Sequence, residues 1–357
     1  MKKLLTILLI PFVLFGCKRR NTHIFDHVTR FSDSSFIHIK PELVKGSLDP
    51  GIGKHFVDIM QVINENTIAI IDDRKTLSLY DKNLKKIQEF SYENTPGLQL
   101  VSPMSIFKTR ENEFNIYDLT TDLIYNFIKE TSNNSWKLAR KQKLPGELSG
   151  LVSIAMANDS TMLATSINNI NGRLINFTLK PEPKVLKYIG DKIDINGNSP
   201  FVTGLVYWSD LAHDSTDVNF VAYHKTDIFE AYNRNGKLIF RMKGPEKFDP
   251  LYRTIGKIDK QRYTENKETK SAFVSIVSDS RFVYLLYSGR TNAFSDRHKA
   301  QKVYILTKTG KPYKTFELNI STDLNKMIID KYHEKLYITS FSEETGSLIY
   351  SVSTKTL

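Results

Sequence analysis

Asp210 and His213 belong to the densest grouping of potential metal ligands in the sequence, the run Asp210-Leu-Ala-His213-Asp214. Carboxylate and imidazole groups coordinate divalent cations, and a metal ion held by them could activate a water molecule for hydrolysis. The same run is more typical of the polar end of an ordinary β-strand, so we expect no metal and no cofactor. A metal-assisted hydrolase or lactonase that uses a central channel is the alternative interpretation.

Other catalytic patterns are missing from the sequence. None of the 8 histidines has the spacing of an H-E-x-x-H zinc site. The run Tyr287-Ser288-Gly289 lacks the first glycine of a G-x-S-x-G nucleophile elbow. The chain has 1 cysteine, which excludes an internal disulfide framework and a multi-cysteine zinc site. With no catalytic motif found, a binding protein is favoured over an enzyme.

Arg290 is a candidate ligand-binding residue because of its position. It follows Tyr287-Ser288-Gly289 at the end of an apolar run that we interpret as an inner strand, where glycine permits a tight bend. A guanidinium there could face a channel entrance and bind a carboxylate or phosphate in bidentate fashion, with Tyr287 on the same rim. The alternatives are an arginine that ties neighbouring structural units together and a tyrosine that belongs to the core.

A long connection between Gly244 and Lys270 is the second candidate binding region. Loops of this length in a compact domain are usually functional or disordered. Aromatic residues interleaved with lysine and arginine could bind a peptide, a glycan or an envelope protein. The N-terminal residues described next indicate export, and an exported protein rarely meets nucleic acid, so we expect no nucleic-acid partner. The candidate contact residues of this loop are Tyr252, Arg253 and Tyr263.

Residues 1–16 have the organisation of a bacterial export signal. Lys2 and Lys3 precede an apolar stretch of about a dozen residues, which is short for a membrane-spanning helix. The run Leu14-Phe-Gly16-Cys17 resembles a lipobox. The resemblance implies cleavage before Cys17 and attachment of thioether-linked lipid and acyl chains such as palmitate. Several acyl chains would make a stable membrane anchor.

The residues after Cys17 indicate an address in the envelope. Lys18 follows the cysteine, and by resemblance to lipoprotein sorting rules this favours the outer membrane over the inner one. An acidic run that would accompany surface export is absent. We therefore expect a lipid-anchored protein of the outer membrane that faces the periplasm, with residues 17–33 as a polar tether.

Residues 34–357 are predicted to form one all-β domain, a six-bladed β-propeller. Short runs rich in valine, isoleucine, tyrosine and phenylalanine alternate with polar turns, and helical periodicity is hard to find. The pattern repeats six times in units of about 45 to 70 residues. A β-sandwich or a propeller with one more blade is the alternative. The recurring turns begin at Asn64, Glu111, Asn158, Ser215, Ser278 and Tyr332.

The last repeat contains only three strand-like runs. We predict that the strand Phe36–Lys40 pairs with this last blade and closes the ring, because sheets tend to avoid open edges. The other blades are predicted at residues 56–90, 104–144, 151–188, 204–243 and 272–318. Their inner strands carry Ser105, Ser153 and Ser275, which suit a hydrated channel better than a metal cage.

The lipobox, the six repeats, the closing strand and the motif Leu286-Tyr287-Ser288-Gly289-Arg290 together resemble the TolB-like six-bladed propeller lipoproteins of Bacteroidota. That resemblance implies a fold and an envelope location, but no established reaction. The sequence therefore predicts a lipid-anchored module that binds a peptide, glycan or envelope protein.

Overall fold

The computed structural model describes residues 36–39, 42–43, 56–193, 197–213, 218–293, 300, 302–318, 323–342 and 346–357. The leader, Cys17 and the tether lie outside these residues, and the statements about them stay predictions. No helix in the described ranges is long and apolar enough to cross a membrane.

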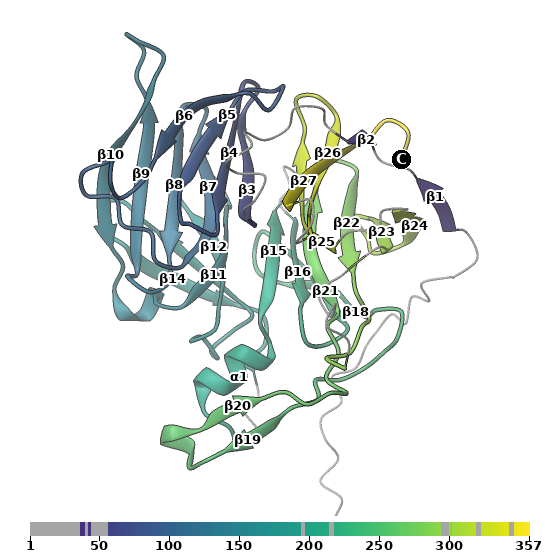
Figure 1. The fold of residues 1–357 in the computed structure, drawn as a ribbon. Helices are drawn as coiled ribbons and strands as arrows, with labels where there is room; N and C mark the ends of the chain where they lie inside the picture. Colours follow the sequence, from purple (N-terminus) through teal and green to yellow (C-terminus); the bar gives the residue numbers. More distant parts are fainter. Residues whose placement is uncertain are drawn as a thin grey trace, which may run out of the picture.

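The described residues form six blade sheets, each built around consecutive antiparallel strands, and one separate two-stranded sheet (Figure 1). The strands lie where the apolar runs predict them.

Blade one has β3 (Val57–Asn64), β4 (Thr67–Asp72), β5 (Leu77–Tyr80) and β6 (Lys86–Phe90). Blade two has β7 (Pro103–Arg110), β8 (Glu113–Asp118), β9 (Leu123–Lys129) and β10 (Trp136–Lys143). Blade three has β11 (Leu151–Met156), β12 (Met162–Ser166), β13 (Leu174–Thr178) and β14 (Lys184–Ile189). Blade four has β15 (Ser209–His213), β16 (Val218–Tyr223), β17 (Ile228–Asn233) and β18 (Leu238–Lys243). Blade five has β21 (Phe273–Ser278), β22 (Phe282–Tyr287), β23 (Lys302–Thr307) and β24 (Pro312–Leu318). Blade six has β25 (Asp323–Asp330), β26 (Lys335–Ser342) and β27 (Gly346–Ser353).

The turns between the first two strands of a blade are held by short polar side chains. A side-chain oxygen accepts a hydrogen bond from the backbone N–H two residues later, which fixes the turn locally. This bond measures 3.0 Å at Asn64, 3.0 Å at Asn158, 2.7 Å at Asp279 and 3.0 Å at Asp330. The polar turns predicted in these blades are therefore confirmed, whereas the turn near Ser215 lies outside the described residues.

The innermost strands line the centre of the ring. Strands β3, β7, β11, β15, β21 and β25 contact one another in that order, and β25 also contacts β3. The first hairpin of the blade has a register shift near the start of the innermost strand in blades one, two, three, five and six. Such bulges bend a strand and increase its twist, which suits strands that crowd around an axis.

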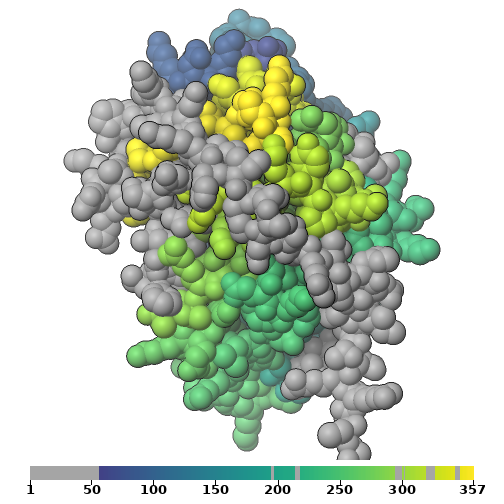
Figure 2. All heavy atoms as spheres, turned by 90° about the vertical axis from the view of Figure 1, so that its right-hand side faces the viewer, coloured from purple at the N-terminus to yellow at the C-terminus, as the bar shows by residue number. Residues whose placement is uncertain are grey.

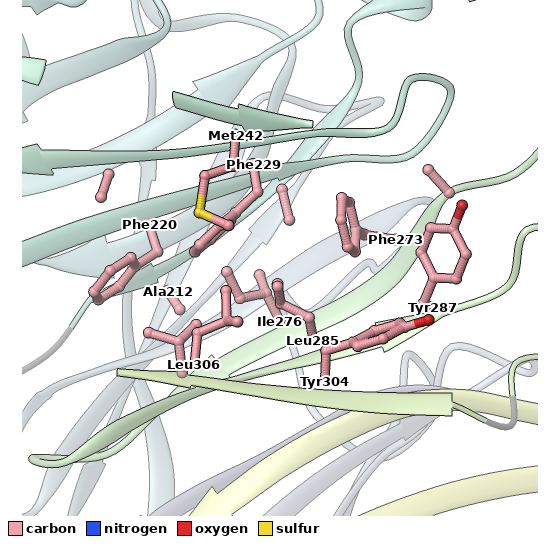
Figure 3. Close-up of a cluster of buried hydrophobic side chains, with 14 of the residues drawn as sticks. Ala212, Phe220, Phe229, Met242, Phe273, Ile276, Leu285, Tyr287, Tyr304 and Leu306 are labelled. Carbon is pink, nitrogen blue, oxygen red and sulfur yellow. The ribbon is translucent and has the colours of Figure 1, made fainter. Parts of the chain in front are cut away.

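The apolar core is divided among the junctions between blades. One cluster of buried side chains fills each junction, from blades one and two round to blades six and one. Figure 3 shows the cluster of blades four and five, where Phe229 and Met242 face Phe273, Ile276 and Leu285. In Figure 2 the yellow C-terminal strands lie beside the first blade, as the shared cluster of blades one and six requires. Burial on both faces explains why second strands such as β4 and β22 are almost continuously buried, whereas the outermost strands β6, β10 and β14 carry exposed polar residues.

The N-terminal strand does not pair as predicted. Strand β1 (Phe36–Ile39) pairs in parallel with β24, so it adds a fifth strand to blade five and not to the last blade. The outer edge of blade six is instead paired by the short strand β2 (Glu42–Leu43), which runs antiparallel to β27. The alternating pattern of Phe36–Lys40 predicts a strand but not its partner. The outer edges of blade five and blade six both pair with this part of the chain.

Blades three, four and five carry extra elements at one end, which we call the insertion face. The link from β14 to β15 holds the helix α1 (Pro200–Val206), which the sequence analysis missed. The link from β18 to β21 holds β19 (Arg253–Ile255), the 3-10 turn η3 (Ile258–Lys260) and β20 (Arg262–Thr264), which together form the insertion hairpin. Figure 1 shows α1, β19 and β20 beyond the same end of the blades.

Helix α1 is anchored by its first turn and by a close packing contact. The Ser199 hydroxyl accepts a hydrogen bond from the Val202 N–H at 3.2 Å, and a proline occupies the first helical position. A Cβ on Gly204 would lie 1.7 Å from the carbonyl oxygen of Ile167. Glycine at this position therefore allows the helix to rest directly on the backbone of blade three.

Candidate functional site

The insertion hairpin brings together three of the predicted binding residues. Tyr252, Arg253 and Tyr263 lie at its base, and the rings of Tyr252 and Tyr263 are 5.8 Å apart. Arg253 pairs with Thr264, and Thr254 pairs with Tyr263. Since side chains alternate across a strand pair, Arg253 and Arg262 share the outer face with Ile255. Arg253, Ile255 and Arg262 are all exposed.

Hydrogen bonds fasten the hairpin to the loop before α1. The Asn198 amide donates to the Tyr252 hydroxyl at 2.8 Å, and the Ser199 N–H donates to Gln261 Oε1 at 2.7 Å. Two separate insertions are thereby joined into one platform. The tyrosines of the hairpin are half-buried and contribute to this joint, so Arg253 is the more exposed of the predicted contact residues.

A second set of bonds connects the hairpin to blades four and five. Glu265 accepts hydrogen bonds from the Tyr263 hydroxyl at 2.9 Å and from the Asn292 amide at 2.7 Å, and it forms an ion pair with Lys225 at 2.8 Å. Burial acts to raise the pKa of Glu265. The contacts with Lys225, Asn292 and Tyr263 outweigh this effect and lower the pKa to about 2. The carboxylate therefore stays charged at neutral pH.

The platform also exposes apolar side chains that the sequence analysis did not single out. Ile255 is 62% exposed, Ile258 is 58% exposed and Phe201 of α1 is 50% exposed. Phe201 and Ile258 line one pocket of about 430 Å³. The signal in the sequence is a pair of isoleucines among lysines and arginines in a loop, but it does not reveal which side chains are turned outward.

A buried charge network lies below α1, at the junction of blades three and four. Glu230 is 1% exposed and accepts hydrogen bonds from the Tyr223 hydroxyl at 2.7 Å and the Tyr232 hydroxyl at 2.8 Å. It also pairs with Arg241. The Arg173 guanidinium lies 5.3 Å from the ring centre of Tyr207, the residue that caps the end of α1. This network supports the helix from beneath.

The charges of the network set the protonation of Glu230. Burial acts to raise the pKa of this carboxyl group. Arg173 and Arg241, with hydrogen bonds from the two tyrosines, outweigh burial and hold the pKa below its ordinary value. Glu230 is therefore an anion between two cations.

Two expectations about Tyr287 and Arg290 need correction. Tyr287 is 2% exposed, and its ring packs 5.3 Å from Phe273 and 5.7 Å from Tyr304 (Figure 3). It is a core residue and offers no contact area to a partner. Arg290 follows β22, the second strand of blade five and not the innermost one. It is half-buried and does not line the central cavity.

Asp227 is buried beside Tyr287. It holds the first residues of the link from β18 to β21, which we call the stem of the insertion hairpin. Its Oδ2 accepts the N–H groups of Glu246 at 2.8 Å and Lys247 at 2.7 Å, while its Oδ1 has no hydrogen-bond partner in the described structure. Burial is the main reason why the pKa of Asp227 is raised to about 6, with a further contribution from the negative charge of Glu246. This group therefore changes charge in the mildly acidic range.

The central channel is a cavity of about 720 Å³ that all six innermost strands line. Ser105, Ser153 and Ser275 lie on these strands, as predicted, but their hydroxyls connect neighbouring blades. They accept N–H groups from Ile154 at 3.3 Å, Leu211 at 3.2 Å and Met327 at 3.1 Å, respectively. The serines thus act as braces between innermost strands.

Asp210 and His213 both line the channel, but each has a protein partner. Asp210 forms an ion pair with Lys326 at 3.1 Å and lies 3.4 Å from His224 Nε2. Burial alone would raise the pKa of the Asp210 carboxyl group. The charges of Lys326 and His224 outweigh burial and hold this pKa well below its ordinary range. His213 Nδ1 is 2.7 Å from Asn219 Oδ1. Within the described ranges, no group of three or more His, Cys, Asp or Glu residues is arranged to hold a metal ion.

Comparisons with known proteins identify the fold and not a family. No protein-family model matches the sequence, and no curated protein matches it. Among solved structures, a Bacteroides fragilis NCTC 9343 protein described as exported aligns with a TM-score of 0.51 and 11% identity, over 91% of this chain and 94% of that chain. The β-propeller domain of Myceliophteria thermophila Cps50 (Swd1) aligns with a TM-score of 0.49 and 9% identity, over 87% of this chain and 99% of that one. BamB from Moraxella catarrhalis aligns with a TM-score of 0.37 and 12% identity, over 82% of this chain and 71% of that one. The resemblance to TolB-like lipoproteins stays a prediction.

Proposed function

We propose that this chain is a lipid-anchored propeller of the bacterial envelope that binds a partner protein on its insertion face. The observation that carries the proposal is the platform formed by α1 and the insertion hairpin. Hydrogen bonds between the two links hold the platform in place on the propeller. Binding residues are often found on loops that a stable scaffold positions in this way.

Arg253 is the residue we expect to contribute the recognition charge. Its side chain is exposed, and no ion pair among the described residues involves it. Arginine is enriched at protein interfaces because its planar group binds carboxylates in bidentate fashion. An acidic segment of another envelope protein is therefore the best-matched ligand for this face, ahead of a peptide fragment or a glycan.

The envelope address rests on the leader and on Cys17. Replacing Cys17 by Ser in the full-length protein is expected to abolish the incorporation of labelled palmitate. Unchanged incorporation of the label after this substitution would contradict lipid anchoring at Cys17. The neighbour described as exported is in keeping with such an address, although its likeness extends to the fold alone.

The binding role is tested by crosslinking the full-length protein in its native envelope and capturing it under denaturing conditions. We expect a discrete protein adduct that is lost in Arg253→Glu. Arg140→Glu is the matched control, because Arg140 is also exposed but lies on β10 of blade two. Equal loss of the adduct in both variants, or in neither, would refute the assignment of the insertion face.

A further inference from the structure

The tip of the insertion hairpin combines two features that rarely occur together on a protein surface. Ile255 and Ile258 are 62% and 58% exposed, and Phe201 at 50% lines the same pocket as Ile258. Exposed aliphatic side chains lose the free energy that burial would give, so a cluster of them indicates a surface that is covered in use.

The second feature is unpaired positive charge around these apolar side chains. Lys257, Lys260 and Arg262 are all exposed, and no ion pair of the described structure includes any of them. Asp259 is the one acidic residue between Arg253 and Thr264. The tip therefore has a net positive charge as well as an apolar surface.

The backbone presents these side chains at a projecting corner. Ile255 pairs with Arg262 at the end of the strand pair, and Gly256 follows with a φ of +98°, in the region that favours glycine. The 3-10 turn then carries Ile258 and Lys260. Figure 1 shows this hairpin extending beyond the blades with its turn at the far end. A projecting end of this kind can reach a flat surface such as a bilayer.

We propose that this tip docks onto an anionic phospholipid surface, with Ile255, Ile258 and Phe201 entering the interface and the three cations beside the headgroups. Apolar side chains in the headgroup region and cations near anionic lipids both contribute to membrane affinity. The contact is a second attachment that would turn the insertion face toward the bilayer. It uses the tip, whereas the partner site uses Arg253 at the base, so one can fail without the other.

Vesicle flotation with the chain that begins at Lys18 tests this contact, because this form lacks the leader and the lipidated cysteine. It retains every described strand and helix. We expect binding to vesicles of phosphatidylcholine mixed with phosphatidylglycerol, weaker binding as salt is raised, and little binding to phosphatidylcholine alone. Absence of binding to the phosphatidylglycerol vesicles would overturn the proposal.

Two double variants separate the apolar and electrostatic contributions. Ile255→Ser with Ile258→Ser is expected to weaken binding at least about tenfold. Lys257→Glu with Lys260→Glu is expected to do the same, since each cation near anionic lipid contributes about fivefold. The control is Ile87→Ser with Ile239→Ser, which removes isoleucines that are 51% and 43% exposed on the outermost strands of blades one and four. Wild-type affinity in either tip variant, or equal loss in the control, would show that the tip does not bind lipid.

A photoreactive residue at position 258 distinguishes lipid from a protein occupant. In the full-length protein in its native envelope, we expect lipid adducts at this position. Protein adducts alone would mean that a partner protein covers the tip, and the lipid assignment would be wrong.

Discussion

Two buried carboxyl groups lie on the two sides of blade four, and their pKa values are shifted in opposite directions. Glu230, at the junction with blade three, lies between Arg173 and Arg241 and has its pKa held below the ordinary value. Asp227, at the junction with blade five, has one oxygen without a hydrogen-bond partner in the described structure, and its pKa is raised to about 6. Burial acts alike on both groups, so the difference comes from the neighbouring groups, which are mainly two cations at Glu230 and include the anion Glu246 at Asp227.

The contrast extends to the two insertions that form the platform. The network of Glu230 supports α1 through Arg173 and Tyr207, and it is charged over the whole neutral range. Asp227 holds the stem of the insertion hairpin through the N–H groups of Glu246 and Lys247. We infer that Glu230, which supports α1, stays charged in mild acid. Asp227, which holds the stem of the insertion hairpin, gains a proton under the same conditions.

The largest effect is expected when Glu230 is replaced by Gln. The change leaves the buried Arg173 guanidinium without its nearby anion and leaves Arg241 with Asp191 alone, at 3.3 Å. Loss of this buried anion should lower the free energy of unfolding by about 3–5 kcal/mol. Urea denaturation measures this change. The control is Glu268→Gln, at an exposed position between β20 and β21, which should change the free energy of unfolding little. A loss below about 1 kcal/mol for Glu230→Gln would mean that the network contributes little to stability.

The next effect concerns the pH dependence due to Asp227. The ordinary pKa of an aspartate is 3.8, and that of Asp227 in the folded protein is about 6. Between these two pH values Asp227 keeps its proton in the folded state and has released it in the unfolded state. Stability from this group is therefore lost as pH rises through that window, by on the order of 2–3 kcal/mol. Asp227→Asn should remove this fall. Parallel stability curves for the variant and the wild type between pH 4 and pH 7 would contradict the raised pKa.

A smaller effect is expected for Lys225→Met, which removes the cation paired with Glu265. Because the pKa of Glu265 is lowered to about 2, its stabilising contribution is present above pH 4.5 and is lost as pH falls toward 2. We expect the variant to be less stable by about 1–2 kcal/mol at neutral pH and to converge with the wild type in strong acid. Hydrogen exchange should become faster in β20. Unchanged exchange there would show that the ion pair does not hold the hairpin.

The smallest effect on stability is expected for Arg253→Glu. The side chain is exposed and forms no ion pair among the described residues, so the free energy of unfolding should change by less than about 0.5 kcal/mol. The melting temperature of purified protein provides the measurement. A large loss would indicate a structural role for Arg253 and would weaken its use as a probe of binding.

The fold could be predicted from the sequence because both of its signals are local. Alternating apolar runs and polar turns such as the one at Asn64 recur along the chain, and each determines its own hairpin. The partner of the strand Phe36–Lys40 could not be predicted, because a short apolar strand can pair with either of two neighbouring edges. Helix α1 was missed because its seven residues show too little periodicity.

The candidate site could be predicted only in part. Charge and aromatic content identified the long loop around Arg253, but the sequence does not show which side of the hairpin a residue occupies. Tyr287 was placed on a rim and is buried, because its run forms a second strand with both faces covered. The role of Ser105, Ser153 and Ser275 as braces depends on the distance between blades, which no single repeat specifies.

The most direct test of the binding role is a comparison of photo-crosslinking from positions 251 and 140 in the full-length protein in its native envelope, with Arg253 left in place. Both positions are exposed, but only the first lies beside Arg253 at the base of the insertion hairpin. We predict a discrete protein adduct from position 251 and none from position 140. The same adduct from both positions, or an adduct from position 140 alone, would contradict the insertion face as the binding surface.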